Sequence, residues 1–387
     1  MKLLRSARFP AILLLIAAVA GLVIANSPIG HDVIELSHAH LAIPGTPIDL
    51  SLTHWVSDGL LVFFFFMVSV ELQFELTRGE LRSARRAIQP ALAAAGGVIV
   101  PIAIYLLITA GSGFQEGWPI PTATDIAFAL GVLAVFGRGL PSGVRIFLLA
   151  LAIIDDVVGI VFIAVLFATD LNYGMLAAGL LTTVLFGILS RMLHTRARRL
   201  VIALLVVLAA LTWVFILLSG VHATIAGVLL GLAMAQTPAL VTRHVMEPWV
   251  NAVILPLFAF TAALVPIPDF SGPGVSVFWG VLIALPVGKM IGIAGLGWLG
   301  QRLVGTPDHP KLALGDLIAV GALGGIGFTV SLLLANLAFA ADAVVRDKAV
   351  LGVLAGSVIS AIAAGILLTL RVRHHRLAGT AVEEQTT

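Results

Sequence analysis

The sequence predicts an all-α polytopic membrane protein, and three observations support that fold class. Hydrophobic residues make up 60% of the 387 residues, charged residues 11%, and mean hydropathy is +1.11, which is more apolar than a soluble core requires. Apolar runs of about 17 to 25 residues, the length that crosses a bilayer as a helix, recur along the chain. Ionisable side chains nevertheless lie inside some of these runs, where they are costly and mark functional sites.

Twelve apolar segments are long enough to be transmembrane helices. They lie near residues 10–26, 56–77, 88–110, 119–137, 143–168, 172–189, 198–217, 219–235, 241–265, 275–301, 314–338 and 348–370. With this assignment, nineteen of the 22 Lys and Arg residues fall on one side of the membrane, and only Arg346 and Lys348 fall on the other. Because positive residues accumulate on the cytoplasmic side, we expect both termini in the cytoplasm.

The regions outside these segments carry weaker signals. Lys2, Arg5 and Arg8 before a short apolar run also fit a cleavable signal peptide, whose loss would leave eleven spans with the same orientation. Residues 39–54 combine a Pro-Gly turn signal with partial alternation, so we expect either a short hairpin on the outer face or an irregular loop. Residues 377–387 form a polar tail.

Missing residue types exclude several functional classes. The chain has no cysteine, which rules out disulfides, thiolate metal sites and thiol chemistry. The HExxH and GxxxxGK[ST] patterns of metalloproteases and nucleotide-driven proteins are also absent. We expect a protein that is not an enzyme, has no cofactor and binds no nucleic acid.

Two adjacent acids, Asp155 and Asp156, are the most informative residues of the chain. They lie inside the apolar segment at 143–168, in a stretch without other charges between Arg145 and Asp170. A charged side chain near the middle of a membrane helix costs about 2.5 to 3.5 kcal/mol, so two in a row predict an ion or proton site.

Two further ionisable residues lie far from any span end. Lys289 is 13 residues before Arg302, about 20 Å along a helix, so its ammonium group cannot reach the membrane surface. Such a lysine either loses its proton or pairs with a carboxylate, for which Asp155 and Asp156 are the candidates. Asp125, in the segment at 119–137, is a third acid at this depth.

Two segments contain residues that interrupt helices. In the segment at 119–137, Pro119, Pro121 and Thr124 precede Asp125, and the segment at 314–338 has glycines at its centre. These are Gly321, Gly324, Gly325 and Gly327. Interrupted spans are tolerated where they line protein or a watery cavity, and Asp125 and Lys289 would offset the partial charges of the exposed helix ends.

The two interrupted segments occupy matching places in the chain. One is the middle of the third to fifth segments (helices 3–5), and the other is the middle of the tenth to twelfth (helices 10–12). The two sets start seven spans apart, and an odd separation gives them opposite orientations in the membrane. This pattern predicts an inverted-repeat transporter with its binding site at the midplane.

At these residues the chain resembles the NhaA family of sodium/proton antiporters. The similar stretches, in family order, are VSDGLLVFFFFMVSVEL at Val56–Leu72, TDIAFALGVLA at Thr124–Ala134, LALAIIDD at Leu149–Asp156, SGVHATIAG at Ser219–Gly227, ILPLFAF at Ile254–Phe260 and GGIGFTVS at Gly324–Ser331. The resemblance covers nearly the whole chain.

The resemblance implies an NhaA-like fold and electrogenic exchange of Na⁺ or Li⁺ for more than one H⁺, for pH and sodium homeostasis. Asp156 would be the principal Na⁺ ligand, with Asp155 beside it and paired with Lys289 in one state. Thr124 and Asp125 would complete the site, at which Na⁺ and protons compete for the carboxylates. Gly324, Gly325, Gly327 and Thr329 would belong to the second interrupted helix.

The resemblance also implies an organisation within a single transporter domain. Helices in the ranges 88–168 and 275–370 would form a core that moves against the helices in 10–77 and 172–265. The protein would be a homodimer in the bilayer of a bacterial inner membrane.

Some roles remain open at this stage. Successive helical residues point about 100° apart, so Asp155 and Asp156 cannot face one point equally. Asp155 is either an ion ligand or a structural partner of Lys289, and Asp125 either contacts the ion or only compensates helix dipoles.

A second group of residues is a candidate for the response to pH or for a cytoplasmic funnel. These are His222, Glu71, Glu75, His244 and Glu247; each has a structural role as its alternative. The chain departs from the better-known bacterial pattern in two places. Gln73 and Phe74 stand where a basic pair is expected, and Arg243 and Glu247 stand where an acid and a histidine are expected, which allows an exchange of charge partners.

Two other classes of membrane protein fit less well. In an intramembrane aspartyl protease Asp125 and Asp155 would form a dyad, but the GxGD signature is absent and a midplane lysine would disturb a shared proton. A passive cation channel would leave the carboxylate and lysine pair without a function.

Overall fold

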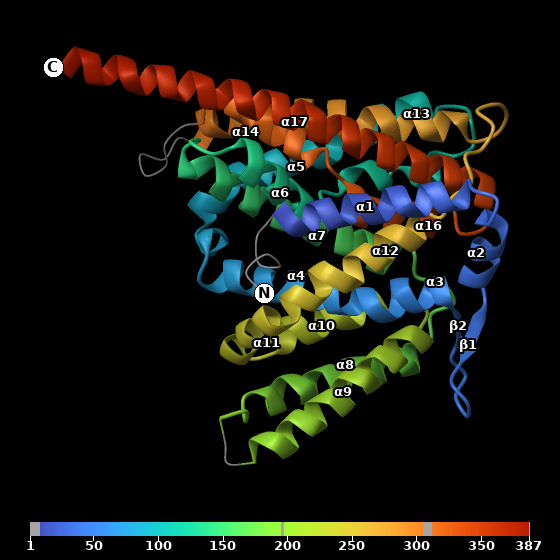
Figure 1. The fold of residues 1–387 in the computed structure, drawn as a ribbon. Coiled ribbons are helices and arrows are strands. Elements are labelled where there is room, and N and C mark those ends of the chain that lie inside the picture. Colours follow the sequence, from blue (N-terminus) through green and yellow to red (C-terminus); the bar gives the residue numbers. More distant parts are fainter. Residues whose placement is uncertain (1–7, 195–196, 305–311, 387) are drawn as a thin grey trace. The chain divides into compact units, whose positions relative to one another are not determined.

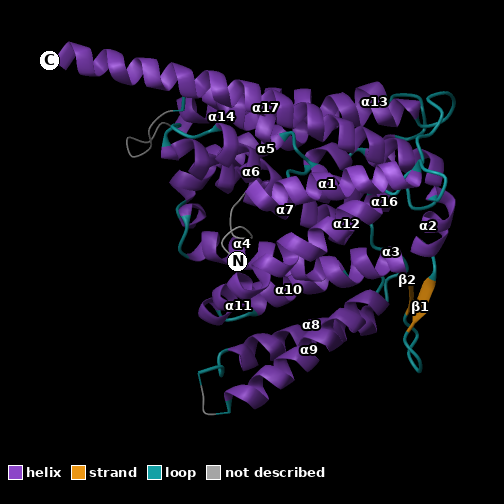
Figure 2. Cartoon of the chain, viewed as in Figure 1, coloured by secondary structure: helices purple, strands orange, loops and turns teal. Residues whose placement is uncertain are grey.

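The computed structural model describes residues 8–194, 197–304 and 312–386, and almost all of them are helical (Figures 1 and 2). By their contacts the described residues divide into two compact units. Unit 1 falls within Met1–Ile16, Glu80–Gly159 and Val265–Thr387, and unit 2 comprises Ala17–Gly79 and Ile160–Leu264. Helix α1 (Arg8–Ala25) contributes to both units.

Unit 1 contains the Asp155–Asp156 pair and both segments with interrupting residues. Its elements are η2 (Glu80–Arg82), α5 (Ala84–Ile108), η3 (Gln115–Gly117), η4 (Ile120–Thr122), α6 (Ile126–Phe136), α7 (Ser142–Leu166, up to Gly159), α13 (Val275–Ile283), η6 (Ala284–Gly288), α14 (Lys289–Val304), α15 (Leu314–Gly324), α16 (Phe328–Ala338) and α17 (Ala343–Thr386). Helix α14 packs on α5 and α15, and α17 packs on α13, α15 and α16.

Unit 2 contains the remaining helices and a β-hairpin. Its elements are α2 (Gly30–Ser37), β1 (His40–Ala42), β2 (Asp49–Ser51), α3 (Leu52–His54), η1 (Trp55–Leu60), α4 (Leu61–Thr77), α8 (Tyr173–Ser190), α9 (Arg198–Leu218), α10 (Thr224–Ala233), α11 (Gln236–Trp249), η5 (Val250–Ile254) and α12 (Leu255–Ala262). Helices α8 and α9 lie side by side as a helical hairpin (Figure 1), and α10 packs on α4.

The hairpin expected within residues 39–54 is confirmed, and the irregular loop is the wrong alternative. Strands β1 and β2 pair antiparallel, with His40 opposite Ser51 and Ala42 opposite Asp49. Gly45, in the turn, has a φ of 81°, a value that glycine adopts without strain.

Among the described residues, eight helices are long and apolar enough to cross a membrane, and the number of candidate spans rises to at most eleven if each bent helix pair counts as one span. The difference from the expected twelve includes the segment at 219–235, which is α-helical only over the ten residues of α10. Ten residues extend about 15 Å, half of the hydrocarbon thickness. At the other end of the chain, α17 extends well beyond the expected range 348–370, to Thr386.

Close helix packing in unit 1 depends on glycine. A Cβ atom on Gly96 of α5 would lie 2.1 Å from the carbonyl oxygen of Gly292 in α14, so the two backbones touch only because side chains are absent. One residue along, a Cβ on Gly97 would lie 3.5 Å from Cδ of Lys289. This contact fixes the stem of Lys289 in the interior of unit 1.

The two segments with interrupting residues are each divided into two helical pieces. Gln115–Thr122 and Ile126–Phe136 meet at a bend of 43°, and α15 and α16 meet at a bend of 49°. In the first, Ala123 and Asp125 have extended ψ angles of 156° and 99°, which end the helical hydrogen bonding. In the second, α15 ends at Gly324 and α16 begins at Phe328.

Candidate functional site

The two bends are joined to each other by hydrogen bonds. We call residues 120–125 and 324–329, with the buried side chains of Asp155, Asp156 and Lys289, the crossing. The Thr124 hydroxyl lies 2.8 Å from the carbonyl oxygen of Gly324, and the Asp125 N–H donates to the carbonyl oxygen of Ile326 at 2.6 Å. Carbonyl and amide groups freed by one bend are therefore satisfied by the other, as burial requires.

Asp125 caps two helices at once. Its Oδ1 accepts from the N–H of Phe128 in the first turn of α6 at 2.9 Å. Its Oδ2 accepts from the N–H and the hydroxyl of Thr329 in α16, at 3.2 and 2.8 Å. A negative carboxylate at two helix N-termini offsets their partial positive charge, and it leaves Asp125 well supplied with donors.

Lys289 pairs with Asp155 rather than with Asp156. Its Nζ lies 2.6 Å from Oδ2 of Asp155, and both side chains are completely buried. The ammonium group also donates to the carbonyl oxygen of Thr122 and to the Thr124 hydroxyl. The position of Lys289 alone left both acids open as partners, and the family resemblance implied Asp155. The structure pairs Lys289 with Asp155, because successive residues of α7 point in different directions.

Asp156 is buried, and no donor in the described part of the chain reaches its Oδ1. The same holds for Oδ1 of Asp155. Asp156 is 4% exposed and lies within the electrostatic influence of Asp155, Asp125 and Lys289. A buried carboxylate oxygen without a donor is unfavourable, so it has capacity for a proton or a cation.

The crossing presents oxygen atoms in place of a closed metal cage. Among the described residues, no group of three or more His, Cys, Asp or Glu side chains is arranged to hold a metal ion. A cation here would use the free carboxylate oxygens with hydroxyl, carbonyl or water oxygens, the ligand types that hard cations prefer.

Two serines that the sequence analysis did not single out also hold the crossing. The Ser331 hydroxyl of α16 donates to the carbonyl oxygen of Ile120 at 2.7 Å. The Ser357 hydroxyl of α17 accepts from the N–H of Phe328 at 3.2 Å. Serine in an apolar helix is common, so only the position of Ser331 within the GGIGFTVS motif could have drawn attention to it.

The candidates for pH response belong to unit 2, not to the crossing. His222 Nε2 lies 3.0 Å from Asp58 Oδ1, and its Nδ1 lies 2.8 Å from the Thr224 hydroxyl. Glu71 pairs with Arg243, so the exchanged charge partner that the sequence allowed is present.

The other candidates for pH response lie on α4 and α11, and Gln73 lies on α4 as well. His244 and Glu247 are 4.0 Å apart on an exposed face of α11, and Glu75 is buried. The Gln73 amide donates to the carbonyl oxygens of Leu232 and Met234, at 2.8 and 2.9 Å. Gln73 thus ties α4 to the end of α10 without a charge.

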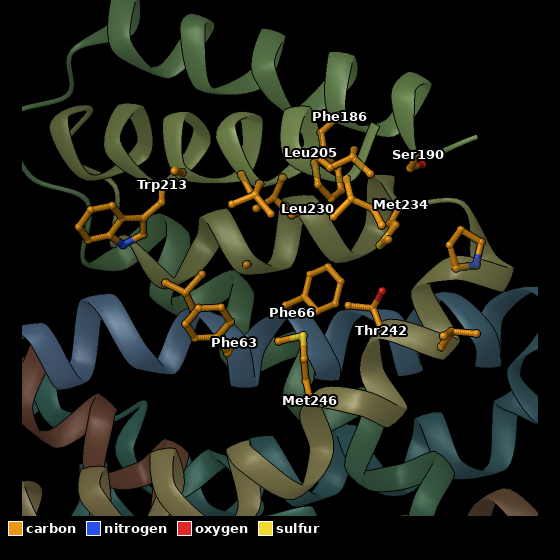
Figure 3. Close-up of a pocket in the computed structure, with 18 of the residues that line it drawn as sticks. Phe63, Phe66, Phe186, Ser190, Leu205, Trp213, Leu230, Met234, Thr242 and Met246 are labelled. Atoms are coloured by element: carbon orange, nitrogen blue, oxygen red, sulfur yellow. The ribbon is translucent and has the colours of Figure 1, made fainter. Parts of the chain in front are cut away.

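Unit 2 also encloses a large pocket, with a volume of about 1270 Å³. Figure 3 shows Phe66, Leu205 and Leu230 facing into it from α4, α9 and α10. Arg191, His194 and Arg198 are among its lining residues, and no acid is. Among the described lining residues, a cation would find no negatively charged ligand.

A polytopic helical fold whose buried carboxylates lie beside two bent helix pairs is the architecture of a secondary ion transporter. A profile of the family Na⁺/H⁺ antiporter 1 matches residues 1–368. The chain is 53% identical to the Na⁺/H⁺ antiporter NhaA 2 of Clavibacter michiganensis, covering 99% of this chain and 95% of that protein. It is 43% identical to the NhaA antiporter of Tropheryma whipplei, covering 95% of each.

The chain belongs to the Na⁺/H⁺ antiporter 1 family, and it is an integral multi-pass membrane protein. Its fold is similar to that of the sodium proton antiporter MjNhaP1 of Methanocaldococcus jannaschii, solved at pH 8. That similarity has a TM-score of 0.56 at 15% sequence identity and covers 92% of this chain and 91% of the other.

Proposed function

We propose that this protein exchanges Na⁺ for protons across the membrane. Its relatives are named as Na⁺/H⁺ antiporters. The observation that carries the proposal is the arrangement at Asp155 and Asp156. Lys289 forms an ion pair with Asp155, and each of the two acids keeps one buried carboxylate oxygen without a donor among the described residues. An acid in that position binds either a proton or a cation, which is what an antiporter requires.

Competition at Asp156 is the proposed mechanism. The carboxylate would release its proton to one side when it binds Na⁺, and it would take up a proton when Na⁺ leaves on the other side. Thr124, whose hydroxyl contacts Asp155, and Asp125, which holds the two helix ends, would fix the geometry of the site. Li⁺ has the same charge and ligand preference, so we propose it as a second substrate.

Asp155 and Lys289 would take part in the proton cycle. When Na⁺ occupies the site, the positive charge of Lys289 competes with it for Asp155 Oδ2, so the pair would open. More than one proton per Na⁺ makes exchange electrogenic, and each elementary charge then couples to the membrane potential at about 2.3 kcal/mol per 100 mV.

We propose that unit 1 is the transport core and that it moves against unit 2 to expose the crossing to each side. The division of the described residues into these two units supports that assignment. In this arrangement Gln115–Phe136 and Leu314–Ala338 are interrupted spans. Helix α10 is a short span that brings the total to twelve. Both termini would be cytoplasmic, and the protein would be a homodimer in a bacterial inner membrane.

We place the response to pH in unit 2. The pairs Asp58–His222 and Glu71–Arg243 are its candidates, together with Glu75, His244 and Glu247. Because Arg243 replaces an acid that the family pattern leads one to expect, the activation pH of this protein would differ from that of relatives with the acid.

Exchange by purified protein in liposomes tests the function. A preset pH gradient should collapse when Na⁺ is added to wild-type vesicles, and Asp156→Asn should abolish the collapse while the protein stays folded. Asp347→Asn is the matched control, since it makes the same change at a buried acid that pairs with Arg346 on α17. Exchange at the wild-type rate in Asp156→Asn would refute the site assignment.

A further inference from the structure

Helix α17 forms one wall of the bend between α15 and α16. Two of its serines, Ser357 and Ser360, are one turn apart and share a helical face. Ser357 caps α16 by accepting from the N–H of Phe328. Ser360 is completely buried, at 0% exposure, so it faces neither lipid nor bulk water.

The Ser360 hydroxyl lies against the backbone of the bend. A Cβ atom on Gly325 would be only 2.5 Å from Ser360 Oγ, so glycine at this position makes room for the hydroxyl. Gly325 directly follows Gly324, whose carbonyl oxygen contacts the Thr124 hydroxyl. Ser360 is therefore next to the same short peptide segment that contacts the site, on the side of α17.

Ser360 lacks the hydrogen bond that other buried serines of this protein make. Its Oγ has no partner among the described residues. By contrast, Ser69, Ser190 and Ser219 donate to carbonyl oxygens of their own helices, at 2.9, 2.7 and 2.7 Å. A buried hydroxyl without a partner costs about 1 to 3 kcal/mol, and a bound water is the usual partner of such a group.

We propose that Ser360 is a further residue of the ion route and that its hydroxyl binds a water molecule in the bend between α15 and α16. This water would also bond to carbonyl oxygens at the end of α15, whose second lone pairs are available. In this proposal the water is one step of a hydrated path by which Na⁺ approaches Asp156. The proposal rests on the proposed exchange of Na⁺. It adds α17 to the helices that contact water molecules along the path of the ion.

Because the chain has no cysteine, a single introduced thiol reports water access directly. Thiols react with methanethiosulfonates as thiolates, which form in water and not in a dry interior. Purified Ser360→Cys should react with 2-aminoethyl methanethiosulfonate, forming a mixed disulfide that mass spectrometry counts. Saturating Na⁺ should slow the reaction at least twofold.

Ser69→Cys is the matched control. Ser69 is also 0% exposed, and its hydroxyl also lies against a glycine, since a Cβ on Gly231 would be 2.1 Å away. It differs in having a hydrogen-bond partner, so Ser69→Cys should stay unmodified until the protein is denatured. The proposal is overturned if Ser360→Cys is modified only after denaturation, or if Na⁺ leaves its rate unchanged.

Transport kinetics give a second, independent readout. Ser360→Ala removes the water ligand and should raise the apparent KM for Na⁺ severalfold while the maximal rate changes less than twofold. A KM equal to that of wild type overturns the proposal. Absence of exchange in wild-type vesicles, with thiol labelling as expected, would instead refute the proposed function and leave the hydrated site standing.

Discussion

The crossing in unit 1 and the pocket in unit 2 are both enclosed by helices, yet they differ in chemistry. The pocket has a volume of about 1270 Å³ and no acid in its lining. The crossing is tightly packed, but it brings together Asp125, Asp155, Asp156 and Lys289, all at most 4% exposed. The difference shows why we assign the ion site from buried charge and not from open volume.

The groups of the crossing also depend on each other in a way that the pocket side chains do not. Asp125, Asp155 and Lys289 are held by specific partners, and losing one partner leaves the other unsatisfied. The pocket is lined mostly by apolar side chains, so truncating one of these enlarges a space that already exists. We therefore expect substitutions in the crossing to change both transport and stability. Substitutions in the pocket should change stability alone.

The largest effect on stability is expected from Lys289→Ala. It leaves Asp155 buried without its counter-charge, which should cost about 3 to 5 kcal/mol in the free energy of unfolding. Adding Asp155→Asn should recover part of this loss, because the orphaned charge is removed as well. Thermal unfolding of the two single variants and the double variant in detergent measures the coupling, and strictly additive losses would show that the pair is energetically irrelevant.

Truncating a pocket residue should affect stability but not ion binding. Leu205→Ala removes a buried side chain next to the pocket and should cost about 2 to 3 kcal/mol. Its apparent KM for Na⁺ should stay within twofold of wild type. The control is Leu151→Ala, because Leu151 is buried beside Gly324 of the crossing, and there the KM should rise. If the KM for Na⁺ increased in Leu205→Ala and not in Leu151→Ala, the ion site would have to be assigned to the pocket.

A smaller effect is expected at the end of α16. Thr329→Val removes one of the donors to Asp125 Oδ2 and keeps the backbone N–H in place. The loss should be about 1 kcal/mol, with a severalfold slower exchange because the crossing is less rigid. Thr183→Val is the control, since Thr183 donates only to the carbonyl oxygen of Gly179 in its own helix, and its exchange rate should not change.

The smallest effect is expected at the Arg243–Glu71 pair. Both side chains are partly exposed, at 32% and 21%, so water already screens their attraction. Arg243→Ala should change the free energy of unfolding by less than about 1 kcal/mol. Melting curves at low and high salt check this value, and a loss as large as that of Lys289→Ala would contradict the contrast between the two pairs.

The sequence was most informative where a residue violated its apolar surroundings. Asp155, Asp156 and Lys289 were identifiable because charge in a membrane segment is costly, whereas the choice of Asp155 as the partner depends on the rotation of α7. The serines of the crossing were not identifiable, since Ser357 and Ser360 differ from other helical serines only in what the fold places beside them.

Helix lengths show a similar limit. The apolar run at 219–235 predicts a full span, but Met234 is already extended, with a ψ of 139°, and α10 begins only at Thr224. The π-helical segments η1, η5 and η6 had no sequence signal either. Hydropathy measures how apolar a segment is, and tertiary packing decides where its helix starts and ends.

The central claim is that Na⁺ and a proton compete for Asp156, and proton release on Na⁺ binding tests it most directly. When NaCl is added to purified protein in weakly buffered detergent solution, wild type should release protons with a saturable dependence on Na⁺, and an equal addition of choline chloride should release none. Asp156→Asn should release none with either salt. Saturable proton release that persists in Asp156→Asn, or its absence in a wild-type protein that binds Na⁺, would contradict the account.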